Sequence, residues 1–209
     1  CCFAAQGAPE TDDRAHQERN RRRMDFAGEV GADAFLYMSG RKPEGRDVTD
    51  EDIIKSAEAA DAWQDYASQY GLELTYHVHT NLAVDSVDQW KLYMANLKKA
   101  KLCVDVSHAD LWGYDAVESL NDFKGQLNYV HLQDYSDCTV REPGKYNPTW
   151  VAVGEAVCLD FEGCAQILKD NGYDRWVTSC PRAAQPGDDA IIESKRSAKM
   201  YEYCRSAGF

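Results

Sequence analysis

Short apolar runs alternate along this chain with longer segments in which apolar residues recur every three or four positions. Short runs bounded by turn residues predict buried strands, and the wider spacing predicts amphipathic helices. The predicted strands are 34–38, 72–76, 102–106, 127–132 and 175–180. The predicted helices are 13–30, 49–70, 86–97, 114–123, 160–171 and 188–205. This alternation, with no hairpin dipeptide between the strands, predicts βα repeats around a parallel sheet.

Local signals mark the ends of several of these helices. Thr49 and Asp52 match a capping box, and Gly71 is placed to end the helix that follows. Residues 1–5 are interpreted as the end of a further strand. The segment 135–159 is predicted to be a long loop, and loops of that length in compact domains are usually functional or disordered.

Composition limits the function classes. A chain of 209 residues fits one domain, and its net charge of −12 disfavours binding to nucleic acid backbones. The basic residues within 19–23 are interpreted as a solvated helix face. No apolar run reaches the ~18 residues that a membrane span requires.

The eight cysteines form no Cys-x-x-Cys pair. Neither a zinc ribbon nor a small disulfide scaffold is therefore indicated, and most are predicted to be buried thiols in a reducing, cytoplasmic location. The chain begins with Cys1 and Cys2, without an initiator Met or a signal peptide, so we expect it to begin partway into a longer architecture.

Ionisable side chains gather at the ends of three consecutive predicted strands. His77 and His79 lie on one face of their strand because side chains alternate, and such a pair alone could be ordinary hydrogen-bonded residues. In parallel α/β folds, however, the carboxyl ends of the strands converge on one crevice or barrel mouth. Six residues occupy these ends and predict a shared site: His77, His79, Asp105, His108, His131 and Asp134.

An ordered set of short motifs resembles a known family. The set is Tyr76-His77-Val78-His79-Thr80, Val104-Asp105-Val106-Ser107-His108, Val130-His131-Leu132-Gln133-Asp134, Gly154-Glu155 with Asp160-Phe161, and Gly172-Tyr173 with Trp176. It is similar to the xylose-isomerase-like sugar phosphate isomerase/epimerase barrels, and within them most to the inosose dehydratase branch. The resemblance implies a (β/α)₈ TIM barrel with a divalent metal, often manganese or cobalt, at the strand ends.

The resemblance also implies roles for individual residues. Metal ligands would be His77, Asp105 and His131, with Cys180 where the family has a ligating Glu. Catalytic groups would be His79, His108 and Glu155. Substrate-binding groups would be Arg41, Gln133 and Asp134. Gln133 stands where a Lys is common, and Ala156 replaces the second glycine of a Gly-Glu-Gly turn.

Two departures from the family follow. A thiolate at Cys180 favours a softer ion such as zinc over manganese. The chain is also shorter than the ~250 residues of such barrels. We therefore expect residues 1–209 to form a single partial TIM-barrel domain that lacks its first two βα units. Because an open parallel sheet leaves unpaired edges, we expect a homo-oligomer or a complementing N-terminal segment.

The function implied is that of a metal-dependent sugar (phosphate) isomerase or epimerase. It would act on a small polyhydroxylated carbonyl compound by proton abstraction next to the carbonyl. The alternatives are an inosose or keto-sugar dehydratase, which is a lyase, and an inactive barrel that serves as a binding or partner subunit. Barrel-type endonucleases are disfavoured by the acidic charge.

Overall fold

A computed structural model describes residues 13–139, 146–156, 158–180 and 189–209. The chain divides into two compact units, residues 1–103 and 104–209, which are described separately. The strand predicted for residues 1–5 lies outside the described residues.

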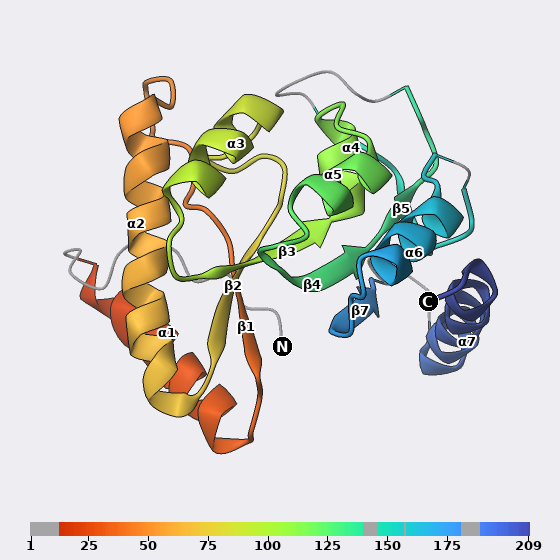
Figure 1. Ribbon diagram of the computed structural model, residues 1–209, viewed down its shortest axis with the longest axis horizontal. Coiled ribbons are helices and arrows are strands. Elements are labelled where there is room, and N and C mark those ends of the chain that lie inside the picture. The colour runs from red at the N-terminus through yellow and green to blue at the C-terminus, as the bar shows by residue number, and fades with distance from the viewer. Residues whose placement is uncertain (1–12, 140–145, 157, 181–188) are drawn as a thin grey trace. The chain divides into compact units, whose positions relative to one another are not determined.

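The first unit is an alternation of helices with parallel strands, shown in Figure 1. Its elements are α1 (Arg14–Glu29), β1 (Ala34–Tyr37), α2 (Asp50–Ala67), η1 (Ser68–Tyr70), β2 (Glu73–His77), α3 (Val87–Asn96) and β3 (Lys101–Asp105). Strand β2 pairs in parallel with β1, where Phe35 is opposite Leu74, and with β3, where His77 is opposite Cys103. Helix α2 packs against α3 and β2. The predicted strands and helices of this unit are thus confirmed.

Helix α2 shows why its ends and its buried face could be predicted. The Thr49 side chain accepts a hydrogen bond from the Asp52 N–H, and the Asp52 carboxylate accepts one from the Thr49 N–H, which completes the capping box. Ile53 and Trp63 on its apolar face are fully buried. The face expected from the spacing is therefore the one that packs inward.

One carboxylate on α2 ties this helix to a distant turn. Asp61 is buried and accepts hydrogen bonds from the backbone N–H groups of Lys98 (2.8 Å), Lys99 (2.8 Å) and Ala100 (3.0 Å). These residues connect α3 to β3. A single side chain therefore satisfies three consecutive backbone donors of this connection.

The second unit begins inside β3 and continues the same alternation (Figure 1). Its further elements are α4 (Val106–Leu111), α5 (Ala116–Asp122), β4 (Leu127–Leu132), β5 (Asp134–Tyr135), β6 (Trp150–Val151), α6 (Phe161–Asp170), β7 (Trp176–Ser179) and α7 (Ala190–Ala207). Strands β4 and β7 are parallel, and the N–H of Cys180 donates to the carbonyl of Leu132 (2.7 Å) just beyond β7. Helix α5 packs against both α4 and α6.

Two parts of this unit differ from the sequence prediction. Helix α4 starts directly after β3, where only a loop was expected, because Asp105 caps it as soon as the strand ends. The segment expected to be one long loop contains the end of β5 and all of β6, which pair antiparallel with Tyr135 opposite Trp150. The prediction of one long loop is therefore wrong at β5 and β6, whereas β4 and β7 are parallel as predicted.

The cysteines also require a correction. Cys138 and Cys158 form a disulfide with a Cα–Cα distance of 5.1 Å, whereas thiols were expected. Cys103, Cys164 and Cys204 are buried thiols, as predicted. Disulfides are rare in reducing compartments, so the disulfide does not support the cytoplasmic location, which stays a prediction.

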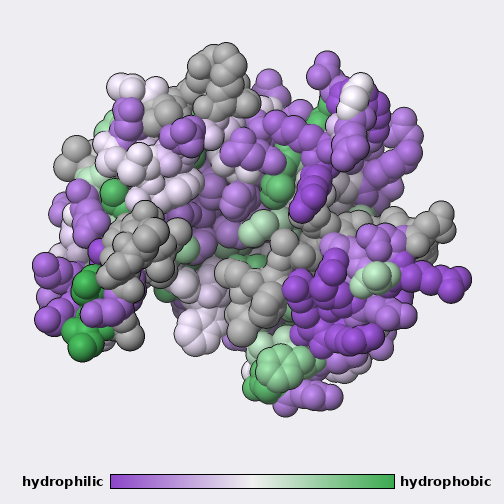
Figure 2. All heavy atoms as spheres, turned by 180° about the vertical axis from the view of Figure 1, so that it is seen from behind, coloured by the Kyte–Doolittle hydropathy of each residue, from purple (hydrophilic) through white to green (hydrophobic). Residues whose placement is uncertain are grey.

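The exposed surface agrees with the acidic, polar composition. Hydrophilic side chains dominate the face in Figure 2, and hydrophobic ones appear there in small separate groups. Within the described residues, none of the helices is both long enough and apolar enough to cross a membrane.

Candidate metal centre and active site

The carboxylate of Asp105 is the most constrained group at the strand ends. It is completely buried, and its Oδ1 accepts hydrogen bonds from Ser107 N–H (3.1 Å), Ser107 Oγ–H (2.6 Å) and His108 N–H (3.4 Å). Its Oδ2 lies 2.9 Å from His131 Nδ1 and 3.8 Å from His108 Nε2. The helix cap thus fixes one oxygen and directs the other toward two imidazoles.

Neighbouring groups raise the pKa of the buried His131 and so favour its protonated form. Burial alone would lower the pKa of His131, but the charge and hydrogen bond of Asp105, together with hydrogen bonding to Cys180, raise it to about 10. The ion pair therefore stabilises the folded protein fully below about pH 6.5, and this contribution is lost as the pH rises to about 10. The second unit thus brings together Asp105, His108, His131 and Cys180.

His108 is covered by an aromatic ring that the sequence did not indicate. The imidazole is 2% exposed, and the ring of Trp150 meets it at an angle of 65° with a centroid distance of 5.1 Å. Trp150 also contacts Tyr135 edge-on at 6.2 Å, and the Tyr135 hydroxyl donates to Asp110. A chain of contacts therefore runs from His108 through Trp150 and Tyr135 to Asp110.

His77 and His79 lie at the end of β2 in the first unit, as predicted. His77 is buried, and the two rings meet nearly at right angles with a centroid distance of 6.0 Å. The Nδ1 of His79 lies 2.7 Å from the carbonyl oxygen of Thr80. Because a carbonyl only accepts, Nδ1 of His79 carries the proton of this hydrogen bond.

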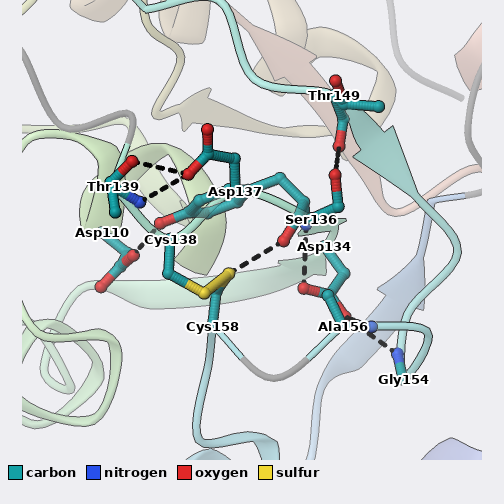
Figure 3. Close-up of a disulfide and its surroundings, with 11 residues drawn as sticks. Asp110, Asp134, Ser136, Asp137, Cys138, Thr139, Thr149, Gly154, Ala156 and Cys158 are labelled. Carbon is teal, nitrogen blue, oxygen red and sulfur yellow. Dashed lines mark hydrogen bonds between the residues drawn. A yellow bond between two sulfur atoms is a disulfide. The ribbon is translucent and has the colours of Figure 1, made fainter.

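Asp134 holds the turn that carries Glu155, and Figure 3 shows its carboxylate beside Gly154 and Ala156 of this turn. The buried carboxylate accepts hydrogen bonds from the N–H groups of Gly154 (3.1 Å), Ala156 (3.2 Å) and Tyr135 (2.8 Å). Burial raises the pKa of Asp134, while these three hydrogen bonds act to lower it. Glu155 is exposed, and its carboxylate accepts a hydrogen bond from the Ala152 N–H (3.1 Å). Hydrogen bonds to both Asp134 and Glu155 therefore hold this turn.

Replacing Gly154 by Ala should destabilise this turn strongly. Gly154 has a φ of +87°, and a Cβ built there would lie 2.5 Å from the ring of Tyr203. Gly113 has a similar φ of +82° but nothing within 4 Å, so Gly113→Ala is a matched control for the backbone strain alone. We expect a loss of about 1 kcal/mol for Gly113→Ala and about 1–3 kcal/mol more for Gly154→Ala in urea denaturation. Equal losses would show that the contact with Tyr203 contributes nothing.

The other two predicted substrate-binding residues, Arg41 and Gln133, belong to different units. Arg41 lines a cavity of about 480 Å³ in the first unit, together with Tyr37 and Lys55. Gln133 is partly buried in the second unit, between β4 and β5. Their roles remain predictions.

Sequence reasoning missed two residues of the site. Ser107 donates twice to Asp105, and the signal for this was the spacing Asp-x-Ser, which is typical of a side chain that caps a helix. Trp150 has no such signal, because it is distant from His108 in the sequence.

Comparison with known proteins agrees with this arrangement. The family model for the xylose isomerase-like TIM barrel matches residues 2–201. An inosose dehydratase from Lacticaseibacillus casei is 22% identical over 162 residues, which cover 70% of this chain and 54% of that protein. The chain thus spans about half the length of that relative.

Two solved structures share the fold at low sequence identity. The IolI protein, whose structure contains a zinc atom, matches with a TM-score of 0.72 and 18% identity over 100% of this chain and 77% of that one. An L-ribulose 3-epimerase matches with a TM-score of 0.67 and 15% identity over 98% of this chain and 70% of that one. Together with the strand-end motifs, the family match confirms the predicted fold: the chain belongs to the xylose isomerase-like TIM barrel family.

Proposed function

We propose that this protein is a divalent-metal-dependent enzyme that abstracts a proton next to the carbonyl of a keto-sugar or inosose. The observation that carries the proposal is the Asp105 carboxylate, which has one oxygen fixed by three donors and the other directed at His108 and His131. Isomerisation, epimerisation and dehydration share this first proton transfer. The names of the relatives, inosose dehydratase and L-ribulose 3-epimerase, support this class of substrates.

We propose His77, Asp105 and His131 as the protein ligands of the cation, with Cys180 or water completing the shell. The pairing of β2 with β3 supports the inclusion of His77, since it is opposite Cys103 and Asp105 follows Cys103 by two positions on the same strand face. Imidazole and carboxylate donors suit manganese, cobalt and zinc, and a thiolate favours zinc.

When bound, the cation would polarise the substrate carbonyl. The protein's own side chains would transfer the proton and bind the substrate. His108 is the proposed group that takes the proton, with His79 as the second candidate, because an imidazole both accepts and donates protons near neutral pH. Glu155 is a further proposed catalytic group, and Arg41, Gln133 and Asp134 are proposed to bind the substrate.

The test is hydrogen exchange at the carbon next to the carbonyl. The protein loaded with manganese, cobalt or zinc is incubated in deuterated water with a panel of keto-sugars and inososes, and NMR follows the loss of the α-hydrogen signal. We expect exchange with at least one substrate, because proton abstraction precedes all three outcomes. Absence of exchange with every metal and substrate, from folded protein, would favour a non-catalytic binding subunit.

Binding of the cation should also release protons. Because Asp105 and Cys180 raise the pKa of His131 to about 10, this residue is protonated in the metal-free protein at pH 7 and must lose its proton to bind. We expect zinc affinity to rise about tenfold per pH unit between pH 6 and 8. Titration calorimetry in buffers of different ionisation enthalpy should show about one proton released per ion. If the wild-type protein releases a second proton and the variant Cys180→Ser does not, Cys180 binds the ion as a thiolate. Release of no proton at pH 7 would contradict the role of His131.

A further inference from the structure

The disulfide closes a segment that carries two parts of the candidate site. Cys138 follows β5, and Cys158 precedes α6. Between them lie β6 with Trp150 and the turn at Gly154 that Asp134 holds. Figure 3 shows the disulfide beside this Asp134 turn. The bond therefore restrains the backbone on both sides of the segment.

The contact between Trp150 and His108 depends on the position of β6. A two-residue pairing with β5 and a hydrogen bond from the Ser136 N–H to the Thr149 carbonyl (3.0 Å) hold this strand, and an isolated pair of that size is marginal by itself. Trp150 is partly buried, whereas the imidazole it covers is almost fully buried. Releasing β6 would consequently expose His108 to water and remove the ring that fixes its orientation.

We infer that Trp150 is a positioning residue for His108 and that the Cys138–Cys158 disulfide holds it in place, so that reduction of the disulfide weakens the site. The effect on turnover rests on the proposed function, in which His108 moves the proton. The chemistry is a two-electron reduction: a dithiol such as dithiothreitol supplies two electrons and two protons, the S–S bond breaks, and the dithiol closes into its own disulfide.

Two observations support reduction of the disulfide: Cys138 is accessible to a reductant, and Cys158 has a hydrogen-bond acceptor beside it. Cys138 is exposed to solvent, so a dithiol can reach the bond. The Sγ of Cys158 lies 3.0 Å from the carbonyl oxygen of Tyr135. In the disulfide this sulfur has no proton, but as a thiol it can donate to that carbonyl.

Positioning can be tested on the metal-free protein without any substrate. The chain has five histidines, so the imidazole Hε1 signals are few, and His108→Gln assigns the one from His108. In the oxidised protein, Trp150→Ala should shift this signal, since the indole ring current is removed, and Trp150→Phe should shift it less. Dithiothreitol, or the double variant Cys138→Ser/Cys158→Ser without reductant, should shift it in the same direction. Trp176→Ala is the matched control, because that tryptophan is 56% exposed on β7.

The exchange assay then gives the effect on turnover. Trp150→Ala and the double serine variant should each lower kcat for α-hydrogen exchange by about ten- to a hundredfold with KM nearly unchanged, while Trp150→Phe restores much of it. A His108 signal that responds neither to reduction nor to Trp150→Ala, in a wild-type protein that exchanges substrate, would overturn the inference and leave the proposed function intact. A responding signal in a protein without exchange would support the positioning and refute the proposed function.

Discussion

The variant Asp105→Asn should lose its bound metal almost completely. Asn has the same shape and also caps helices, so its carbonyl oxygen can keep the hydrogen bonds with Ser107 and His108 and preserve the start of α4. Its NH₂ group, however, replaces the oxygen that faces His131, and an NH₂ group cannot bind a cation. We expect zinc affinity to fall more than about 100-fold, with an almost unchanged far-UV circular dichroism spectrum.

Asp134→Asn is the matched control for this prediction. Asp134 is equally buried and also accepts three hydrogen bonds, all of them from backbone N–H groups, so both variants remove one buried negative charge. Metal content measured by mass spectrometry after dialysis should drop for Asp105→Asn alone. Wild-type metal content in Asp105→Asn would refute the ligand assignment, and equal losses in both variants would indicate a general effect of charge.

The variant His108→Gln should separate catalysis from metal binding. If His108 moves the proton, its loss should lower α-hydrogen exchange by about 10²- to 10⁴-fold, which is the usual contribution of a general base. Metal content should stay at the wild-type level, because His108 Nε2 is 3.8 Å from Asp105 Oδ2 and is not among the proposed ligands. Exchange rate and metal content are measured on the same preparation.

Two other histidines complete this experiment. His16→Gln changes a histidine on α1, outside the proposed site, and should leave exchange unchanged. His79→Gln tests the alternative base, whose Nδ1 bonds to the carbonyl of Thr80. A large loss in His79→Gln with none in His108→Gln would transfer the role to His79.

Helix ends and strand positions could be predicted because their signals are local. The Thr49/Asp52 box needs only neighbouring residues, and it is present as expected. Helix α4 escaped prediction because Asp105 ends a strand, caps a helix and faces His131 at once. The position of Asp105 at the end of a predicted strand marked it as a site residue but did not indicate that it also caps a helix.

Features that depend on distant residues could not be predicted. Strands of two residues, such as β5 and β6, are too short to show a period. The pairing of Cys138 with Cys158 cannot be deduced from one sequence with eight cysteines. Trp150 reaches His108 only because that pairing and the β5–β6 contact bring the segment back.

The carboxylate of Asp61 protects the backbone amides of the connection between α3 and β3 from solvent. Backbone amides in loops usually exchange with solvent through small local openings, but those of Lys98, Lys99 and Ala100 are bonded to a buried group on α2. They can open only when α2 separates from the connection. Slow hydrogen exchange at these three amides would therefore report the cooperative stability of the first unit. Secondary structure alone would place these amides among the least protected, because they belong to neither a helix nor a strand.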